Sequence, residues 1–311
     1  MKAVKRGGVR GLIEVNGITK KFGNLTAIQD ITFQVESGMI YGLVGYNGAG
    51  KTTLLKTMAD VYRPDSGSVL VNGQPVRDNP AVKQNLFLVP DDLYFLPYSG
   101  MEQMAAFYAN FYPGFRMDTF HRLADAFGLE TKKRLSGFSK GMQRQAELVL
   151  GLSAHPNVLL LDESFDGLDP QKRAIVKNLV TQYVAETDTS VIISSHNLHE
   201  LSDLCDRIGL INGKTLALDY SVEEMSHSRC KIRAVFAQEM SEEYFNGIPH
   251  TRFRQDGKII SFSTAENPDV VTKQLQSLKP LLVEQFPLTL EEIFLEEMEG
   301  TDYDFSGFFT E

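Results

Sequence analysis

The sequence predicts an α/β protein with a mainly parallel central sheet, an N-terminal antiparallel β subdomain, an inserted α-helical subdomain and a small C-terminal α+β appendage. Three apolar runs of strand length, at 39–44, 157–164 and 190–194, indicate the central sheet. Continuous runs of this kind are typical of parallel strands that are buried on both faces. Residues 171–184 lie between two of these runs and carry apolar side chains at helical spacing, so strands and helices alternate.

Length, charge and cysteine content limit the class of protein. The chain has 311 residues, of which 42% are hydrophobic and 23% charged, with a net charge of −9. This charge argues against binding of nucleic acid through phosphate contacts. The two cysteines, Cys205 and Cys230, supply neither a disulfide framework nor a metal cluster. The basic first ten residues lack the apolar region of a signal peptide, and no apolar run approaches the ~18 residues that span a bilayer. We therefore expect any membrane role to require a partner protein.

The N-terminal part alternates apolar and polar residues as antiparallel strands do. Residues 12–15 and 31–35 alternate clearly, and the stretch KKFGNLTAIQD at 20–30 is predicted to be turn-like. Ser66–Val71 is a further predicted strand, followed by a turn at Asn72-Gly73.

The segment Gly45–Thr53 reads GYNGAGKTT and has the spacing of a phosphate-binding P-loop. It lies between the predicted strand at 39–44 and a predicted helix at 53–61, which is the context that the motif requires. Its glycines let backbone N–H groups point into one hollow, and the helix N-terminus adds partial positive charge. Lys51 can contact the β- and γ-phosphates, and the Thr52 hydroxyl can bind Mg²⁺. The core is therefore predicted to be a P-loop NTPase.

The segment from about 92 to 157 is predicted to be the inserted helical subdomain. Aromatic and methionine side chains from Met101 to Tyr112 follow one helical stripe, and Phe120, Leu123, Ala124 and Phe127 follow a second. Core packing explains at least half of these side chains. A surface that docks a partner protein is the alternative for the rest of the aromatics between 94 and 115.

Charged and polar residues follow two of the apolar strands. Asp162 and Glu163 end the run at 157–164, where open α/β sheets bind ligands, so Mg²⁺ binding and water activation are the functions expected of them. His196 comes directly after the run at 190–194, whereas His199 is interpreted as a surface residue.

The segment Ser136–Gln145 reads SGFSKGMQRQ, which resembles the signature motif of ABC ATPases, the nucleotide-binding subunits of ATP-binding-cassette transporters. The resemblance covers residues 12 to about 220 and includes Walker A, Walker B, a D-loop at 167–169 and a switch histidine at His196. It implies ATP and Mg²⁺ as cofactors. The implied catalytic residues are Glu163, His196 and Lys51. The implied nucleotide-contacting residues are Phe22, which would stack on adenine, and Gly45, Tyr46, Asn47, Gly48, Ala49, Gly50, Lys51, Thr52, Thr53, Asp91, Ser139, Lys140, Gly141, Met142, Asp162 and Asp169; the implied Mg²⁺ ligands are Thr52, Asp91 and Asp162.

The chain departs from the family pattern at several positions. The Q-loop position holds Asp91 in place of glutamine, which shortens its reach to Mg²⁺ and to the attacking water. Tyr46 stands where proline is usual, and Lys140 and Met142 replace glycine and glutamine in the signature. Ser164 replaces a proline, and Asp166 replaces a small or amide residue. Because no catalytic group is lost, an active ATPase is expected.

The resemblance implies an ATPase subunit of exporter type that dimerises on ATP, as a homodimer or a heterodimer, and powers a separate transmembrane permease from the cytoplasmic face of the cell membrane. The alternative is an ABC ATPase that acts on nucleic acid or ribosomes, which the net charge disfavours. Residues 12–221 are assigned to the ATPase domain and 222–299 to an accessory domain, with strands at 230–236 and 281–285, a hairpin at 251–263, and helices at 268–277 and 289–299. Residues 300–311 form an acidic, aromatic tail.

Overall fold

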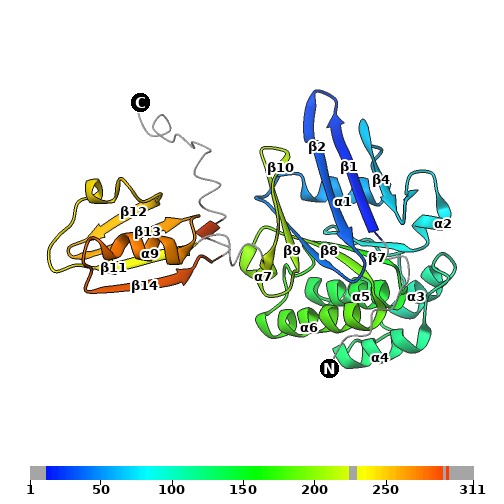
Figure 1. The fold of residues 1–311 in the computed structure, drawn as a ribbon. Coiled ribbons are helices and arrows are strands. Elements are labelled where there is room, and N and C mark those ends of the chain that lie inside the picture. Colours follow the sequence, from blue (N-terminus) through cyan, green and yellow to red (C-terminus); the bar gives the residue numbers. More distant parts are fainter. Residues whose placement is uncertain (1–11, 224–229, 290–291, 294–311) are drawn as a thin grey trace, which may run out of the picture. The chain divides into compact units, whose positions relative to one another are not determined.

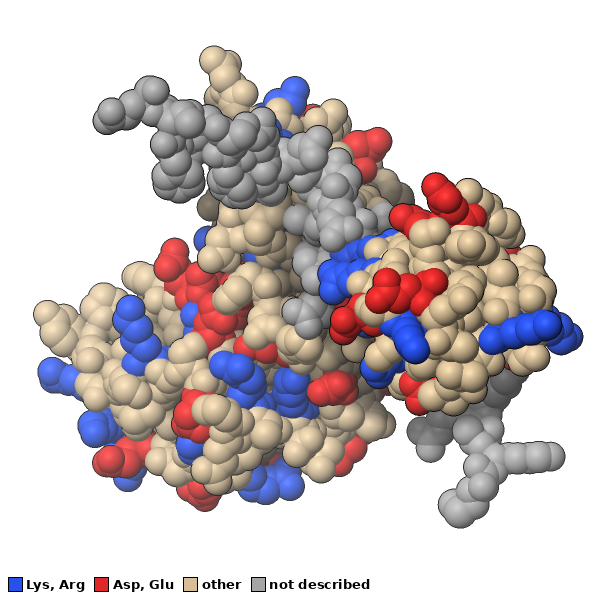
Figure 2. Space-filling view, turned by 90° about the vertical axis from the view of Figure 1, so that its left-hand side faces the viewer, with Lys and Arg blue, Asp and Glu red and all other residues tan. Residues whose placement is uncertain are grey.

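The structure is a computed structural model that describes residues 12–223, 230–289 and 292–293. The chain divides into two compact units, of which the first ends at Asp219 and the second begins at Tyr220 (Figure 1). Among the described residues, no helix is both long and apolar enough to cross a membrane. On the face drawn in Figure 2, acidic and basic side chains are interspersed over the surface.

An antiparallel sheet begins the first unit, with the strand order β2-β1-β4-β5. Its strands are β1 (Leu12–Phe22), β2 (Leu25–Glu36), β4 (Ser66–Val71) and β5 (Gln74–Pro75). The prediction of a turn-like stretch over 20–30 was wrong, because β1 and β2 pair as far as Phe22 and Leu25 and leave a two-residue turn. Burial of Ile28 in the core keeps this stretch in the sheet.

The central sheet includes the three predicted buried runs and has the strand order β10-β9-β3-β8-β7-β6. The bounds of its strands are β3 (Ile40–Val44), β6 (Leu86–Val89), β7 (Val158–Asp162), β8 (Ser190–Ser195), β9 (Arg207–Asn212) and β10 (Thr215–Ser221). Strand β8 pairs in parallel with β3 on one side and β7 on the other. The carboxyl ends of these three neighbours therefore bring the phosphate loop, the Asp162-Glu163 pair and His196 to one edge of the sheet.

Helices pack around this sheet, and some of them belong to the inserted segment (Figure 1). The helices of the first unit are α1 (Lys51–Met58), α2 (Pro80–Lys83), α3 (Met101–Ala109), α4 (Met117–Phe127), the 3₁₀ turn η1 (Leu135–Gly137), α5 (Lys140–Ser153), α6 (Pro170–Thr187) and α7 (Leu198–Ser202). The second predicted stripe lies on α4, where Phe120 and Ala124 are fully buried. The first stripe is not one helix, because α3 ends at Ala109 and both Phe111 and Tyr112 follow it.

The second unit is an antiparallel sheet in the order β12-β13-β11-β14 with a helix on one face. Its elements are β11 (Cys230–Val235), η2 (Glu242–Phe245), β12 (Thr251–Asp256), β13 (Ile259–Thr264), α9 (Pro268–Gln276) and β14 (Leu282–Pro287). The predicted hairpin is confirmed, with Gly257 at a φ of 58° in its turn. Thr289 accepts from the backbone N–H groups of Glu292 and Ile293, but most of the helix predicted at 289–299, and the whole tail 300–311, lie outside the described residues.

Candidate nucleotide-binding site

The loop between β3 and α1 has the backbone that a phosphate cradle requires. Gly48 and Gly50 have φ angles of 85° and 111°, in the left-handed region that favours glycine. A Cβ atom on Gly50 would also overlap the side chain of Ile28. Gly50 is followed directly by α1, so the first N–H groups of this helix face the loop.

A cleft of about 560 Å³ opens beside this loop. It is lined by Phe22, Leu25, Thr26, Ala27, Tyr46, Asn47, Gly48, Gly50, Lys51, Thr52, Thr53, Asp91, Glu163, Asp166 and Lys214. The structure thus brings together most of the predicted nucleotide residues, from elements that are far apart in the sequence. Ala49 is buried, and it lies in the hydrophobic core of the first unit instead of lining the cleft.

Lys51 is held in place by three oxygen atoms at the base of the cleft. Its Nζ donates to the carbonyl oxygens of Gly45, at 2.6 Å, and Tyr46, at 3.2 Å. It also forms an ion pair with Glu163 Oε1 at 3.1 Å, and both side chains are more than nine-tenths buried. A pair so poorly exposed to water is screened less than a surface pair, so these two charges are strongly coupled.

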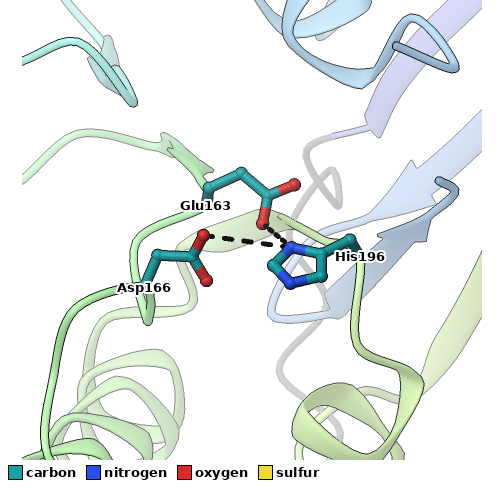
Figure 3. Close-up of side chains that lie close together, drawn as sticks. All are labelled: Glu163, Asp166 and His196. Atoms are coloured by element: carbon teal, nitrogen blue, oxygen red, sulfur yellow. Dashed lines mark hydrogen bonds and ion pairs between the residues drawn. The ribbon is translucent and has the colours of Figure 1, made fainter. Parts of the chain in front are cut away.

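Glu163 lies at the centre of a small polar cluster with His196 and Asp166 (Figure 3). Its second oxygen, Oε2, is 3.1 Å from His196 Nδ1, and Asp166 Oδ2 lies 3.9 Å from the same nitrogen. Burial, followed by the negative charge of Glu163, raises the pKa of Asp166. Glu163 has a φ of 46°, a left-handed backbone that is uncommon for a residue with a Cβ.

The cluster has the residue types of a metal site, but its surroundings favour hydrogen bonding. Glu163, Asp166 and His196 each offer one ligand atom, all within 4.8 Å of one another. The Lys51 ammonium group, however, is bound to the same carboxylate, and its positive charge opposes a cation there.

Asp162 offers a better fit for Mg²⁺. It is fully buried, and its Oδ1 accepts from Ser194 Oγ at 2.7 Å and from Thr52 Oγ1 at 3.2 Å. Its Oδ2 is buried with no hydrogen-bond partner among the residues that the structure describes. Burial raises the pKa of Asp162, against the effect of both hydrogen bonds. A hard divalent cation that prefers oxygen ligands would satisfy the unpaired atom and stabilise the charged form.

Phe22 lines the cleft and is the last residue of β1. Its side chain is 44% exposed, its ring meets that of Tyr62 edge to face at 5.3 Å, and Lys20 Nζ lies 5.2 Å from the ring centroid. An exposed ring fixed at its edge leaves a face on which a flat base can stack.

Asp91 lines the cleft, but its hydrogen-bond partner is a residue to which the sequence motifs assign no role. Its Oδ1 accepts from Arg144 Nη2 at 2.6 Å, across 53 positions of sequence. This ion pair ties the loop after β6 to the first turns of α5, close to the signature residues. The role of Asp91 as a Mg²⁺ ligand stays a prediction.

The signature residues lie at the start of α5 and do not line this cleft. Ser139 is the N-cap of α5 and accepts from the backbone N–H of Met142 at 3.3 Å. A Cβ on Gly141 would come within 3.2 Å of the carbonyl oxygen of Gly167, so the start of α5 lies beside the predicted D-loop. Asp169 caps α6 through the N–H of Lys172 at 2.9 Å. Lys214 is a cleft residue that no motif marks, whereas Asp166, noted above only as a departure from the family pattern, also lines the cleft.

Comparison with known proteins identifies the family. A family model described as ABC transporter matches residues 28–166. The ABC transporter ATP-binding protein YtrB of Bacillus subtilis (strain 168) is 30% identical over 290 residues, which covers 93% of this chain and 99% of that protein. The chain belongs to the ABC transporter ATP-binding proteins. Membership in this family makes it an ATP-binding ATPase coupled to transport.

Two further matches agree with this assignment. The linearmycin resistance ATP-binding protein LnrL of Bacillus subtilis (strain 168) is 31% identical over 214 residues, which covers 67% of this chain and 68% of that protein. A solved structure of an ATP-binding subunit of an ABC transporter superposes with a TM-score of 0.63 at 23% identity, covering 69% of this chain and 91% of that chain. The predicted P-loop NTPase fold is thereby confirmed.

Proposed function

We propose that this ABC transporter ATP-binding protein works as one half of an ATP-driven dimer, either a homodimer or a heterodimer with a second ATPase domain. ATP lies between the P-loop of one chain and the signature residues 139–142 of the other. The observation that carries the proposal is the separation of these two parts: Lys51 lines the cleft, whereas Ser139 caps a 14-residue helix outside it. A helix N-terminus attracts anions, and here its natural ligand is a γ-phosphate held by the partner.

Within each cleft, three side chains carry out the hydrolysis. Glu163 orients the attacking water and removes its proton, while His196 holds the Glu163 carboxylate through its Nδ1. Lys51 balances the charge that develops on the phosphate oxygens. Thr52, Asp91 and Asp162 are the residues assigned to Mg²⁺, which when bound would neutralise part of the same charge.

A groove beside α3 is suited to the transmembrane partner. It has a volume of about 450 Å³ and is lined by Pro80, Lys83, Gln84, Phe107, Tyr108, Phe111 and Tyr112. The rings of Phe107 and Phe111 lie 5.0 Å apart, and their side chains are 37% and 53% exposed. Exposed neighbouring aromatics are typical of a docking surface, so a permease segment with apolar side chains is the expected occupant.

The relatives favour export over import, because LnrL is named for linearmycin resistance. The protein then acts at the cytoplasmic face of the cell membrane, held there by its permease. Action on nucleic acid or ribosomes is disfavoured by the net charge of −9 and by the interspersed charges in Figure 2.

Substitution of Glu163, the general base, tests the proposed ATP-driven dimer directly. Glu163→Gln keeps the shape of the side chain but removes the carboxylate, so hydrolysis should fall by roughly 10²–10⁴-fold while ATP still binds. With ATP no longer consumed, a stable dimer should elute from a size-exclusion column in ATP and Mg²⁺, and monomer should elute in ADP.

A substitution in the signature, the second half of the shared ATP site, supplies the control for this experiment. Adding Ser139→Arg to Glu163→Gln places bulk at the N-terminus of α5, so the ATP-dependent dimer should disappear while ATP binding to the monomer remains. A Glu163→Gln protein that hydrolyses slowly yet stays monomeric at saturating ATP would leave the ATPase intact and refute the shared site.

A further inference from the structure

The C-terminal sheet has one face that packs on α9 and one that does not. Ile232, Phe262 and Val271 belong to the core cluster formed with α9. Because side chains alternate along a strand, Arg233, which follows Ile232, points to the opposite face. There Arg233 of β11 pairs with Ser261 of β13, which in turn pairs with Arg254 of β12.

This opposite face is hollowed into a groove of about 670 Å³. Six of its residues define the surface that we call the basic groove: Lys231, Arg233, Arg254, Ile259, Ser261 and Phe286. Two acidic residues also line it: Asp256 pairs with Ile259 at the end of the β12–β13 hairpin, and Glu292 binds Lys231 at 3.1 Å.

Two arginines of the groove form no ion pair of their own within the described residues, although Glu284 of β14 is the register partner of Arg233. Arg233 and Arg254 have neither an ion pair nor a side-chain hydrogen bond to any residue that the structure describes. Apolar side chains flank them, with Leu282 50% and Phe286 43% exposed. A groove of this chemistry suits a ligand that offers both carboxylates and aromatic rings.

We propose that the basic groove binds the acidic tail of the same chain, residues 300–311. The tail reads GTDYDFSGFFTE, with three carboxylate side chains, four aromatic rings and no Lys or Arg. Its composition therefore complements both the charge and the apolar flanks of the groove. The carboxylates of Asp302 and Asp304 bind the guanidinium groups of Arg233 and Arg254, and the aromatic rings cover the apolar flanks.

The spacing of the charges agrees with this assignment. Arg233 and Arg254 lie on strands that are two positions apart in the sheet, so their Cα atoms are separated by about 10 Å. In an extended segment Asp302 and Asp304 point to the same side, about 7 Å apart. The long arginine side chains make up the difference.

The tail also starts close enough to reach the groove. Thr289 and Glu292 line the groove, and the last described residue is Ile293. The nine residues from there to Asp302 can span about 30 Å, whereas four strands are only about 15 Å wide. Attachment to the same chain gives the tail an effective concentration on the order of millimolar, so modest contacts suffice.

A disulfide in the full chain tests the proposal. In the double variant Ser261→Cys/Phe305→Cys, mild oxidation should form a bond within one chain, because tail docking brings the two positions to the short Cα separation that a disulfide needs. The native Cys205 and Cys230 are buried and do not compete. The matched control is Gln274→Cys/Phe305→Cys, which places the first thiol at an exposed position of α9, the helix on the other face of the sheet. The 261–305 bond should form at least tenfold faster than the 274–305 bond.

Charge reversal then shows whether the arginines are responsible. Adding Arg233→Glu and Arg254→Glu should remove the tenfold advantage, and adding Asp302→Arg and Asp304→Arg to that protein should restore it. The same reversal at an exposed α9 residue, Lys273→Glu, should leave the rate unchanged. Equal rates for the two cysteine pairs, insensitivity to the arginine reversal, or a bond only between two chains would each overturn the proposal; circular dichroism confirms that the variants compared are folded.

Discussion

A buried carboxyl group beneath the docking groove should make the stability of this protein depend on pH. Glu147 of α5 is 2% exposed, and its Oε1 accepts from the Tyr108 hydroxyl at 3.0 Å. Its Oε2 is buried without a hydrogen-bond partner in the described part of the chain. Burial raises the pKa of Glu147 from 4.5 to about 7, and burial together with the nearby Glu147 carboxyl raises the pKa of Tyr112 to about 12.

The size of the effect follows from this pKa difference. Below about pH 4.5 the group is protonated in both folded and unfolded chains, so burial has its full stabilising contribution there. As pH rises through 7, the folded chain must ionise a buried group, and a shift from 4.5 to about 7 amounts to about 3 kcal/mol of lost stability. About 2 kcal/mol of that loss falls between pH 5.5 and pH 8.

The assay compares the parent with Glu147→Gln, which keeps an oxygen acceptor for Tyr108 but cannot ionise. Urea unfolding followed by circular dichroism should show the variant gaining about 2 kcal/mol on the parent between pH 5.5 and pH 8. Glu186→Gln on α6 makes the same change at an exposed site and should show no such gain. If the stability difference between Glu147→Gln and the parent is the same at both pH values, Glu147 is ionised in the folded protein and the reasoning fails.

Three further outcomes test the assigned roles. Asp91→Gln should keep or raise hydrolysis, because glutamine reaches further and carries no charge, even though the ion pair with Arg144 is lost; a fall in kcat above about tenfold, or 1.4 kcal/mol, would show that the pair is needed. Phe111→Ala should leave basal ATPase activity unchanged and weaken co-purification with the permease, whereas the exposed Tyr244→Ala in the second unit should change neither. A chain shortened after residue 221 should bind ATP in a fluorescence titration, and a folded protein that cannot would refute the assignment of nucleotide chemistry to 12–221.

The strands around the site could be predicted closely because a run of consecutive apolar residues indicates a buried strand. The run VLLL of β7 and the run VII of β8 are apolar without a break, as is typical of strands buried on both faces. The phosphate loop was predictable for a different reason. Its glycine spacing reports a backbone conformation that few other sequences adopt.

The contacts between distant segments could not be predicted in this way. Asp91 meets Arg144 only because the loop after β6 comes to rest beside α5, which no local pattern encodes. The end of α3 was missed because aromatic spacing continues past it: Tyr108 and Tyr112 both pack on Phe87, at 5.1 and 5.0 Å, although only Tyr108 is helical. The aromatic spacing past the end of α3 therefore reflects a shared packing partner, Phe87, and not a continuing helix.

The ion pair between Lys51 and Glu163 turns nucleotide binding into a competition between two anions. A phosphate that approaches Lys51 must displace the Glu163 carboxylate, which already holds the ammonium group at 3.1 Å. Arrival of the substrate therefore releases the base that attacks it, and a molecule too short to reach Lys51 leaves Glu163 engaged. In this way the protein can restrain water activation until a nucleotide phosphate reaches Lys51, with His196 keeping the released carboxylate close by.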